Sequence, residues 1–210
     1  MSDTKENILQ TALRLFARDG YEAVSVRNIA EELGITKGAL YRHYENKRAI
    51  FDSIVERMIE LDAEQARKNE VPVEQYDATP AAYESTSMES IQAFTLEQFE
   101  FWTEDDFASN FRKMLTLEQY RSDEMAKLYS QCLVEGPVDY MEDLFRELTK
   151  KGMLKKENPK QLAVEYCAPL FLLINIYDKT GDKKALMKIL RTHTEHFFEG
   201  YVENKEGNNE

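Results

Sequence analysis

Residues 25–47, SVRNIAEELGITKGALYRHYENK, decide the fold of this chain because they read as two short helices joined by a tight turn. Ser25 suits the cap position before the first helix, and Gly34 suits the position just after it. Thr36 then caps a second helix of about two turns, with Leu40 directed inward. The stretch therefore predicts a helix-turn-helix.

The rest of the chain favours helix as well. Only eight glycines and five prolines occur among 210 residues, and no segment alternates convincingly as a strand does. We predict an all-α fold of about nine helices. One long stretch, from Ser122 to about Lys151, is expected to bend at Gly136-Pro137, and the last two helices are expected over about 159–178 and 182–201.

The charge of the chain is unevenly distributed. The formal net charge is -12, which at first argues against nucleic acid as a partner. Residues 1–58, however, hold nine basic and nine acidic residues, whereas residues 59–210 hold 18 basic and 30 acidic ones. Residues 36–48 hold four basic residues and one acidic residue. Such a chain can approach DNA by its helix-turn-helix and by no other face.

The second helix of the motif carries side chains that suit the DNA major groove. Gly38 and Ala39 have little bulk, so the backbone can come close to the groove floor. A glycine inside a helix costs about 1 kcal/mol relative to alanine, which indicates that close approach is useful here. Tyr41, Arg42 and His43 add phenolic, guanidinium and imidazole donors. We therefore predict a DNA-binding regulator.

Residues 4–57 resemble the DNA-binding domain of the tetracycline-repressor (TetR) family. Tyr44 stands where that family commonly has phenylalanine, a conservative departure that we interpret as helix-junction packing. The residues that carry the resemblance are Ala12, Leu15, Phe16, Gly20, Ser25, Ile29, Ala30, Gly34, Gly38, Leu40, Tyr41, His43, Tyr44 and Lys47.

The resemblance implies which side chains contact DNA. Phosphate contacts are expected from Ser25, Thr36, Tyr41 and Lys47. Positions on or near base edges are expected for Arg27, Lys37, Gly38, Ala39, Arg42 and His43. Ser25 can equally be only a helix cap, and Arg48 is interpreted as a solvated charge.

The resemblance also implies the domain organisation. We expect a helix-turn-helix domain over residues 1–48, a helical effector-binding and dimerisation domain over residues 49–202, and a frayed tail over residues 203–210. Similar proteins form homodimers through their last two helices. The function implied is a repressor that binds a palindromic operator as a homodimer and is released by a small effector.

Aromatic residues and methionines are dense between residues 94 and 129, which is typical of an adaptable apolar pocket. Packing between helices is the alternative interpretation for each of them. The pocket candidates are Phe99, Trp102, Phe111, Met114, Leu115, Tyr129 and Tyr166. The candidates for the dimer interface are Leu170, Ile174, Leu186, Leu190, His193 and Phe197.

Other functions find less support in the sequence. His193 and His196 stand one helical turn apart but lack a third ligand, so we expect no metal, no cofactor and no enzymatic activity. No export signal or membrane-spanning run is recognised, and Cys132 and Cys167 lack metal or redox spacing, so we expect a cytoplasmic protein with no membrane partner. One alternative stays open: the second domain docks a protein partner in place of a small molecule.

Overall fold

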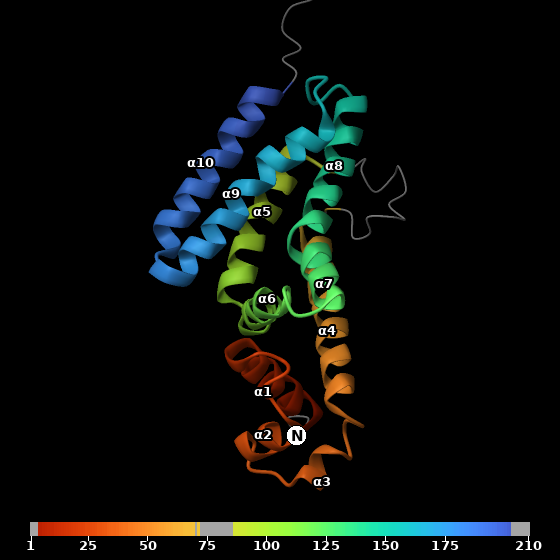
Figure 1. Ribbon diagram of the computed structural model, residues 1–210. Helices are drawn as coiled ribbons and strands as arrows, with labels where there is room; N and C mark the ends of the chain where they lie inside the picture. Colours follow the sequence, from red (N-terminus) through yellow and green to blue (C-terminus); the bar gives the residue numbers. More distant parts are fainter. Residues whose placement is uncertain (1–3, 70, 72–85, 203–210) are drawn as a thin grey trace, which may run out of the picture. The chain divides into compact units, whose positions relative to one another are not determined.

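The computed structural model describes residues 4–69, 71 and 86–202 (Figure 1). No strand occurs among these residues, although Leu154 and Val202 pair as an isolated bridge. The predicted all-α class is confirmed. The helices of the described part are α1 (Thr4–Asp19), α2 (Val26–Glu32), α3 (Lys37–Leu40), α4 (Lys47–Lys68), α5 (Met88–Glu104), α6 (Asp106–Glu118), α7 (Asp123–Leu133), α8 (Glu135–Lys150), α9 (Pro159–Thr180) and α10 (Lys183–Tyr201).

The described residues thus form ten helices where about nine were predicted, because the stretch from Ser122 to Lys151 is not one bent helix. Val134 separates α7 from α8 with φ −129° and ψ −80°, outside the helical region. Pro137 falls in the first turn of α8, where an N–H has no partner within the helix anyway. In a continuous helix its ring would clash with the Leu133 carbonyl, so the helix ends instead of bending.

The helices group into two compact units. The first comprises Met1–Asp62 and Glu104–Leu133, and the second comprises Ala63–Thr103 and Val134–Glu210. The domain boundary predicted between residues 48 and 49 falls inside α4. Along the chain, the first compact unit instead passes into the second between Asp62 and Ala63. The predicted tail, 203–210, lies outside the described residues.

The core of the first unit explains why it takes in a distant piece of chain. Helix α1 buries an apolar face that includes Ile8, Ala12 and Phe16, each 0% exposed. This helix packs against α6, whose Phe111 and Leu115 are also 0% exposed. Full burial of one large apolar side chain stabilises a fold by about 1.5–3 kcal/mol, so α1 and α6 hold each other in place.

The core of the second unit is an aromatic cluster. Helix α9 packs against both α8 and α10 (Figure 1). The Tyr166 ring of α9 lies 5.4 Å from the Phe145 ring of α8 and 4.9 Å from the Phe197 ring of α10, measured between centroids. Both pairs are edge-to-face, the arrangement that aromatic quadrupoles favour. None of the described helices is both long and apolar enough to cross a membrane.

Candidate nucleic-acid interface

The start of α2 is fixed by the predicted Ser25 cap. Ser25 Oγ accepts a hydrogen bond from the Asn28 N–H, and Asn28 Oδ1 accepts one from the Ser25 N–H at 2.9 Å. This reciprocal pair satisfies two donors that the first turn would otherwise leave unpaired. The side chain of Ser25 thus acts as a helix cap in the free protein.

Helix α3 begins where predicted but is shorter than the two turns expected. Thr36 Oγ1 accepts from the Ala39 N–H at 3.1 Å, and the α-helix covers only Lys37–Leu40. The backbone nevertheless stays hydrogen-bonded beyond it, since the N–H of His43 donates to Leu40 O at 2.9 Å. Leu40 and Tyr44 are 0% and 4% exposed, so they anchor this segment to the unit. The packing role predicted for Tyr44 is confirmed.

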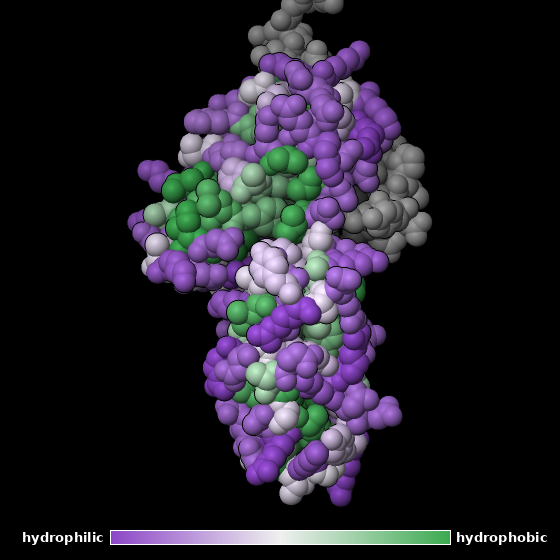
Figure 2. All heavy atoms as spheres, viewed as in Figure 1, coloured by the Kyte–Doolittle hydropathy of each residue, from purple (hydrophilic) through white to green (hydrophobic). Residues whose placement is uncertain are grey.

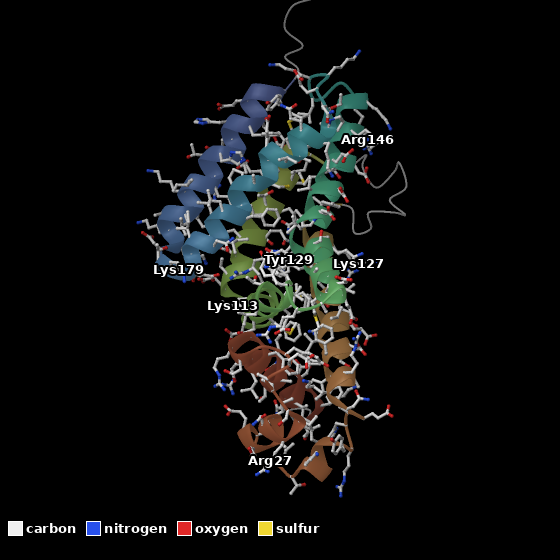
Figure 3. All side chains as sticks on the ribbon, in the orientation of Figure 1. Arg27, Lys113, Lys127, Tyr129, Arg146 and Lys179 are labelled. Carbon is white, nitrogen blue, oxygen red and sulfur yellow. The ribbon has the colours of Figure 1, made fainter. Side chains whose placement is uncertain are left out.

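The predicted DNA-contacting residues face outward with two exceptions. Ala39 and Lys47 are half-buried. Arg27 projects from α2 (Figure 3), and its Nε donates to Glu31 Oε1 at 2.7 Å, a pair that must open before Arg27 can contact a base. The exposed members of the set are Ser25, Arg27, Thr36, Lys37, Gly38, Tyr41, Arg42 and His43.

Two cations near α3 make no ion pair among the described residues. The Arg42 guanidinium is exposed and has no carboxylate partner in that part of the chain. The Lys37 ammonium lies 5.4 Å from the centre of the Tyr41 ring, a contact that leaves its N–H donors available. Arg42 and Lys37 therefore offer positive charge to a phosphate or a base edge without first breaking a salt bridge.

Gly38 has space around the position that a side chain would occupy. A Cβ built there would meet only Thr36 Oγ1, at 4.0 Å. The packing of the protein itself therefore does not require a glycine at this point of the helix. A glycine that the fold does not need, on an exposed helix, fits close approach of an outside surface.

Lys47 is already engaged within the protein. Its Nζ donates to the Tyr21 carbonyl at 2.9 Å and lies 4.2 Å from the centre of the Tyr21 ring. The Tyr21 ring in turn makes edge-to-face contacts with Phe16 and Phe51. Lys47 thus holds the turn after α1 to the start of α4, in addition to any phosphate contact that its other N–H donors make.

Two residues of the first unit, Arg48 and Glu118, make contacts that the sequence interpretation missed. Arg48 is exposed, as a solvated charge is, but it is also paired: it donates to both carboxylate oxygens of Glu124 on α7, at 2.6 and 2.9 Å, and to Asp52. Glu118 on α6 is 1% exposed and accepts from the Tyr21 N–H at 2.9 Å. The contact of Glu118 joins α6 to the turn after α1 across 97 residues, and the contact of Arg48 joins α7 to the start of α4 across 76 residues.

One local signal for Glu118 was available in the sequence. It stands three and seven positions after Leu115 and Phe111, on the face of α6 that the apolar period predicts to be buried. A carboxylate at such a position needs a buried partner. No local pattern, however, could name Tyr21 as that partner.

The predicted pocket residues are buried or half-buried but fall in different units. Phe111, Met114, Leu115 and Tyr129 belong to the first unit. Phe99, Trp102 and Tyr166 belong to the second. Tyr166 is fully packed, and its hydroxyl lies 2.9 Å from Thr95 Oγ1, so it is a core residue there. The ligand site as a whole stays a prediction.

Most of the predicted dimer residues are turned into the second unit. Ile174, Leu186, Leu190 and Phe197 are buried, while Leu170 and His193 are half-buried. His193 Nε2 lies 3.1 Å from the Tyr166 carbonyl oxygen. In the part of the chain that the structure describes, no three His, Cys, Asp or Glu side chains are grouped to hold a metal ion.

Comparison with known proteins agrees with the motif. Residues 8–54 match the family profile described as "Bacterial regulatory proteins, tetR family". The chain is 44% identical over 59 residues to the uncharacterized HTH-type transcriptional regulator YerO of Bacillus subtilis, which is 28% of this chain and 20% of YerO. It is 40% identical over 58 residues to the class C tetracycline repressor protein of Escherichia coli, which is 28% of this chain and 26% of that protein.

A solved structure extends the likeness of fold to nearly the whole chain. The repressor SmeT of the Stenotrophomonas maltophilia multidrug efflux pump SmeDEF superposes with a TM-score of 0.65 at 20% identity, over 97% of this chain and 93% of SmeT. SmeT is also known in a complex with triclosan. The matches to YerO and the tetracycline repressor span about a quarter of those proteins. Residues 8–54 are thus similar to the tetR family of bacterial regulatory proteins, and the likeness to SmeT over nearly the whole chain is one of fold.

Proposed function

We propose that this protein is a cytoplasmic transcriptional repressor that binds a palindromic DNA operator as a homodimer and is released by a small apolar or aromatic effector. The observation that carries the proposal is the exposed face of α3. There and in the turn that follows, Lys37 and Arg42 present positive charge without ion pairs among the described residues, close to a glycine that the fold does not need. We assign the protein no enzymatic activity.

The dimer that we propose uses the exposed apolar residues of α9 and α10. Val164, Leu172 and Ile176 of α9 are 48%, 61% and 36% exposed, and Ile189 of α10 is 53% exposed. The α9 residues are spaced by four or eight positions, which places them on one face of the helix. Figure 2 shows an apolar area over these two helices. Within the same two helices, the interface thus shifts from the buried residues that were predicted to their exposed neighbours.

The dimer has a consequence for DNA recognition. A two-fold axis between the protomers repeats α3, and two recognition helices reach successive major grooves when they are about 34–36 Å apart. The operator is then a near-palindrome of two half-sites one helical turn apart. Each half-site contributes its own phosphate contacts, so affinity falls steeply with salt.

Two observations support an apolar or aromatic effector: the aromatic residues of α5 and the ligand of SmeT. The aromatic candidates Phe99 and Trp102 lie on α5, which is buried on most of its faces. SmeT, which shares the fold, has been solved with triclosan, a small aromatic compound. The alternative is a protein partner that docks on the second unit. A compound that releases DNA from the purified protein favours the effector, and release by a protein alone favours the partner.

The test is selection of an operator followed by quantitative binding. Double-stranded DNA selected from a random library should yield a near-palindrome, and Arg42→Ala should weaken its binding about tenfold or more. Arg18→Ala removes the same charge from an arginine that pairs with Asp19 on α1, and it should change the affinity little. Selection that yields no DNA, or equal affinity of Arg42→Ala and the unsubstituted protein, would refute the proposal.

A further inference from the structure

Among the described residues, two buried side-chain atoms of the second unit make no hydrogen bond, the amide nitrogen of Gln98 on α5 and the hydroxyl oxygen of Thr149 on α8. Gln98 on α5 is 7% exposed, and its amide nitrogen makes no hydrogen bond within the described structure. Other polar side chains of the same helix are satisfied. Thr95 Oγ1 donates to Ile91 O, Thr103 Oγ1 donates to Phe99 O, and Gln92 Nε2 donates to Thr194 Oγ1. Gln98 is therefore an exception on its own helix.

Such an exception needs a physical explanation. An amide N–H that leaves water without gaining a new acceptor destabilises the fold, whereas an apolar side chain of similar volume does not. A buried unpaired donor therefore marks an ordered water, strain, or a group that a ligand satisfies.

The surroundings of Gln98 distinguish between these explanations. On an α-helix, residues three and four positions away share a face, so Phe94, Phe101 and Trp102 flank Gln98. The Phe94 ring contacts Tyr140 of α8 at 6.2 Å, and the Phe101 and Trp102 rings contact each other at 5.4 Å, measured between centroids. A single amide among aromatic rings has the composition of a small-molecule site, where few polar groups fix the orientation of an apolar ligand.

The charge of α5 indicates which kind of acceptor suits the Gln98 amide. Its sequence, MESIQAFTLEQFEFWTE, contains no lysine or arginine. The unpaired donor is thus a neutral amide on a helix without cations, which fits an uncharged oxygen acceptor better than a carboxylate.

We propose that the Gln98 side-chain amide donates a hydrogen bond to an uncharged carbonyl oxygen of the effector, and that it selects ketones, esters or amides over hydrocarbons of the same shape. This inference rests on the proposed function, because it names the chemistry of the effector that the proposed repressor takes. Gln98 is a specificity residue in this scheme, and the aromatic rings beside it supply the apolar contact.

The first test compares two identical substitutions on one helix in the full chain. Gln98→Leu removes an unpaired donor and should raise the Tm of the unliganded protein by about 2–4 °C. Gln92→Leu removes a donor that is bonded to Thr194 at 2.8 Å and should lower the Tm by a similar amount. A Tm loss in Gln98→Leu that equals the loss in Gln92→Leu overturns the proposal.

The second test uses matched probes: benzophenone with diphenylmethane, acetophenone with ethylbenzene, and 2-undecanone with undecane. At least one ketone should bind the unsubstituted protein about tenfold more tightly than its hydrocarbon partner, and Gln98→Leu should remove that preference. The 1H–15N signal of the Gln98 NH2 group, assigned by its loss in Gln98→Leu, should move only with the ketone. An equal response to both members of every pair, or none to any, means a buried water only and overturns the proposal.

DNA binding separates this inference from the proposed function. Unliganded Gln98→Leu should bind the selected operator as tightly as the unsubstituted protein, and the active ketone should no longer release it. If the unsubstituted protein binds no DNA but still prefers the ketone, the proposed function fails and the carbonyl site stands. If DNA binding holds and the preference is absent, the carbonyl site fails alone.

Discussion

The Tyr21 N–H donates to Glu118 Oε1 at 2.9 Å, so the end of α6 holds the turn that follows α1. The same oxygen lies 3.3 Å from Arg121 Nη1. Gly20, beside Tyr21, has φ +87°, and a Cβ there would stand 2.8 Å from Glu118 Oε1. Glycine thus serves twice at this turn: it adopts the left-handed backbone, and it leaves room for the carboxylate.

Glu118→Ala should destabilise the protein. The Tyr21 N–H loses its acceptor, and a buried donor left unpaired costs about 1–3 kcal/mol of the free energy of unfolding. Urea unfolding measures this loss. Glu118→Gln keeps an oxygen at the same place and should cost clearly less. Equal losses for the two variants would mean that the hydrogen bond to Tyr21 contributes nothing.

Gly38→Ala should strengthen the fold and weaken DNA binding. Alanine is favoured over glycine in a helix by about 1 kcal/mol, and the new methyl group has free space in the unbound protein. The same methyl group would hold α3 away from the groove floor, so operator affinity in a gel-shift assay should fall about tenfold or more.

The matched control for Gly38 is Gly200→Ala. Gly200 is also a helical glycine, on α10, with nothing within 4 Å of its would-be Cβ. This substitution should also stabilise the fold, but operator affinity should not change. Undiminished affinity in Gly38→Ala would show that close approach at α3 is not needed.

Leu172→Glu and Ile189→Glu should convert the proposed dimer to a monomer. Both side chains are more than half exposed on the apolar face of α9 and α10, and a carboxylate in a dry interface is costly to desolvate. Light scattering after gel filtration gives the molar mass. Tyr120→Glu is the control, because Tyr120 is 90% exposed in the first unit and its change should leave the mass unaltered.

Both cysteines should be slow to react in the folded protein. Burial raises the pKa of the Cys167 thiol to about 12, and burial with the nearby charge of Asp62 raises that of Cys132 to about 11. The thiolate is the reactive form, so little of it exists at pH 7. Titration with a thiol reagent should show slow labelling that becomes rapid in urea. Rapid labelling of either native thiol would contradict these pKa shifts.

Acid should weaken the first unit through its arginine-paired carboxylates. Hydrogen bonds from Arg48 and Arg14 hold the pKa values of Glu124 and Glu32 below the ordinary 4.5. The stability that these pairs contribute is present above the unfolded pKa and is lost as the pH falls through the folded values. Urea midpoints at pH 7 and pH 3.5 should differ less in Arg48→Met than in the unsubstituted protein. An unchanged difference would show that the Arg48 pair does not contribute to this acid response.

The sequence predicted local features well because neighbouring residues determine them. The caps at Ser25 and Thr36 form as expected, since each side chain bonds an N–H three residues ahead. The Gly136-Pro137 pair predicts a bend, but the helix ends at Val134. Such a pair is compatible with a bend or with a break, and packing against other helices determines which one forms.

Features that depend on distant contacts were harder to predict. Periodicity shows that a helix has an apolar face but not which neighbour covers it. Ile174 and Leu190 were therefore assigned to a partner protomer, although the second unit buries them itself. The hydrogen bond from the Tyr21 N–H to Glu118 joins residues 97 positions apart, and no local sequence pattern predicts this pairing.

The two units are interleaved along the chain, since Glu104–Leu133 returns to the first unit between two segments of the second. A gene fragment that ends after residue 62 would expose the α1 surface that α6 covers and would lack the carboxylate that Tyr21 needs. A recombination event that joins the helix-turn-helix to a different second unit must therefore also transfer α6 and α7, which belong to the first unit. The first unit is encoded by two separate segments of the gene, so a single crossover cannot transfer it whole.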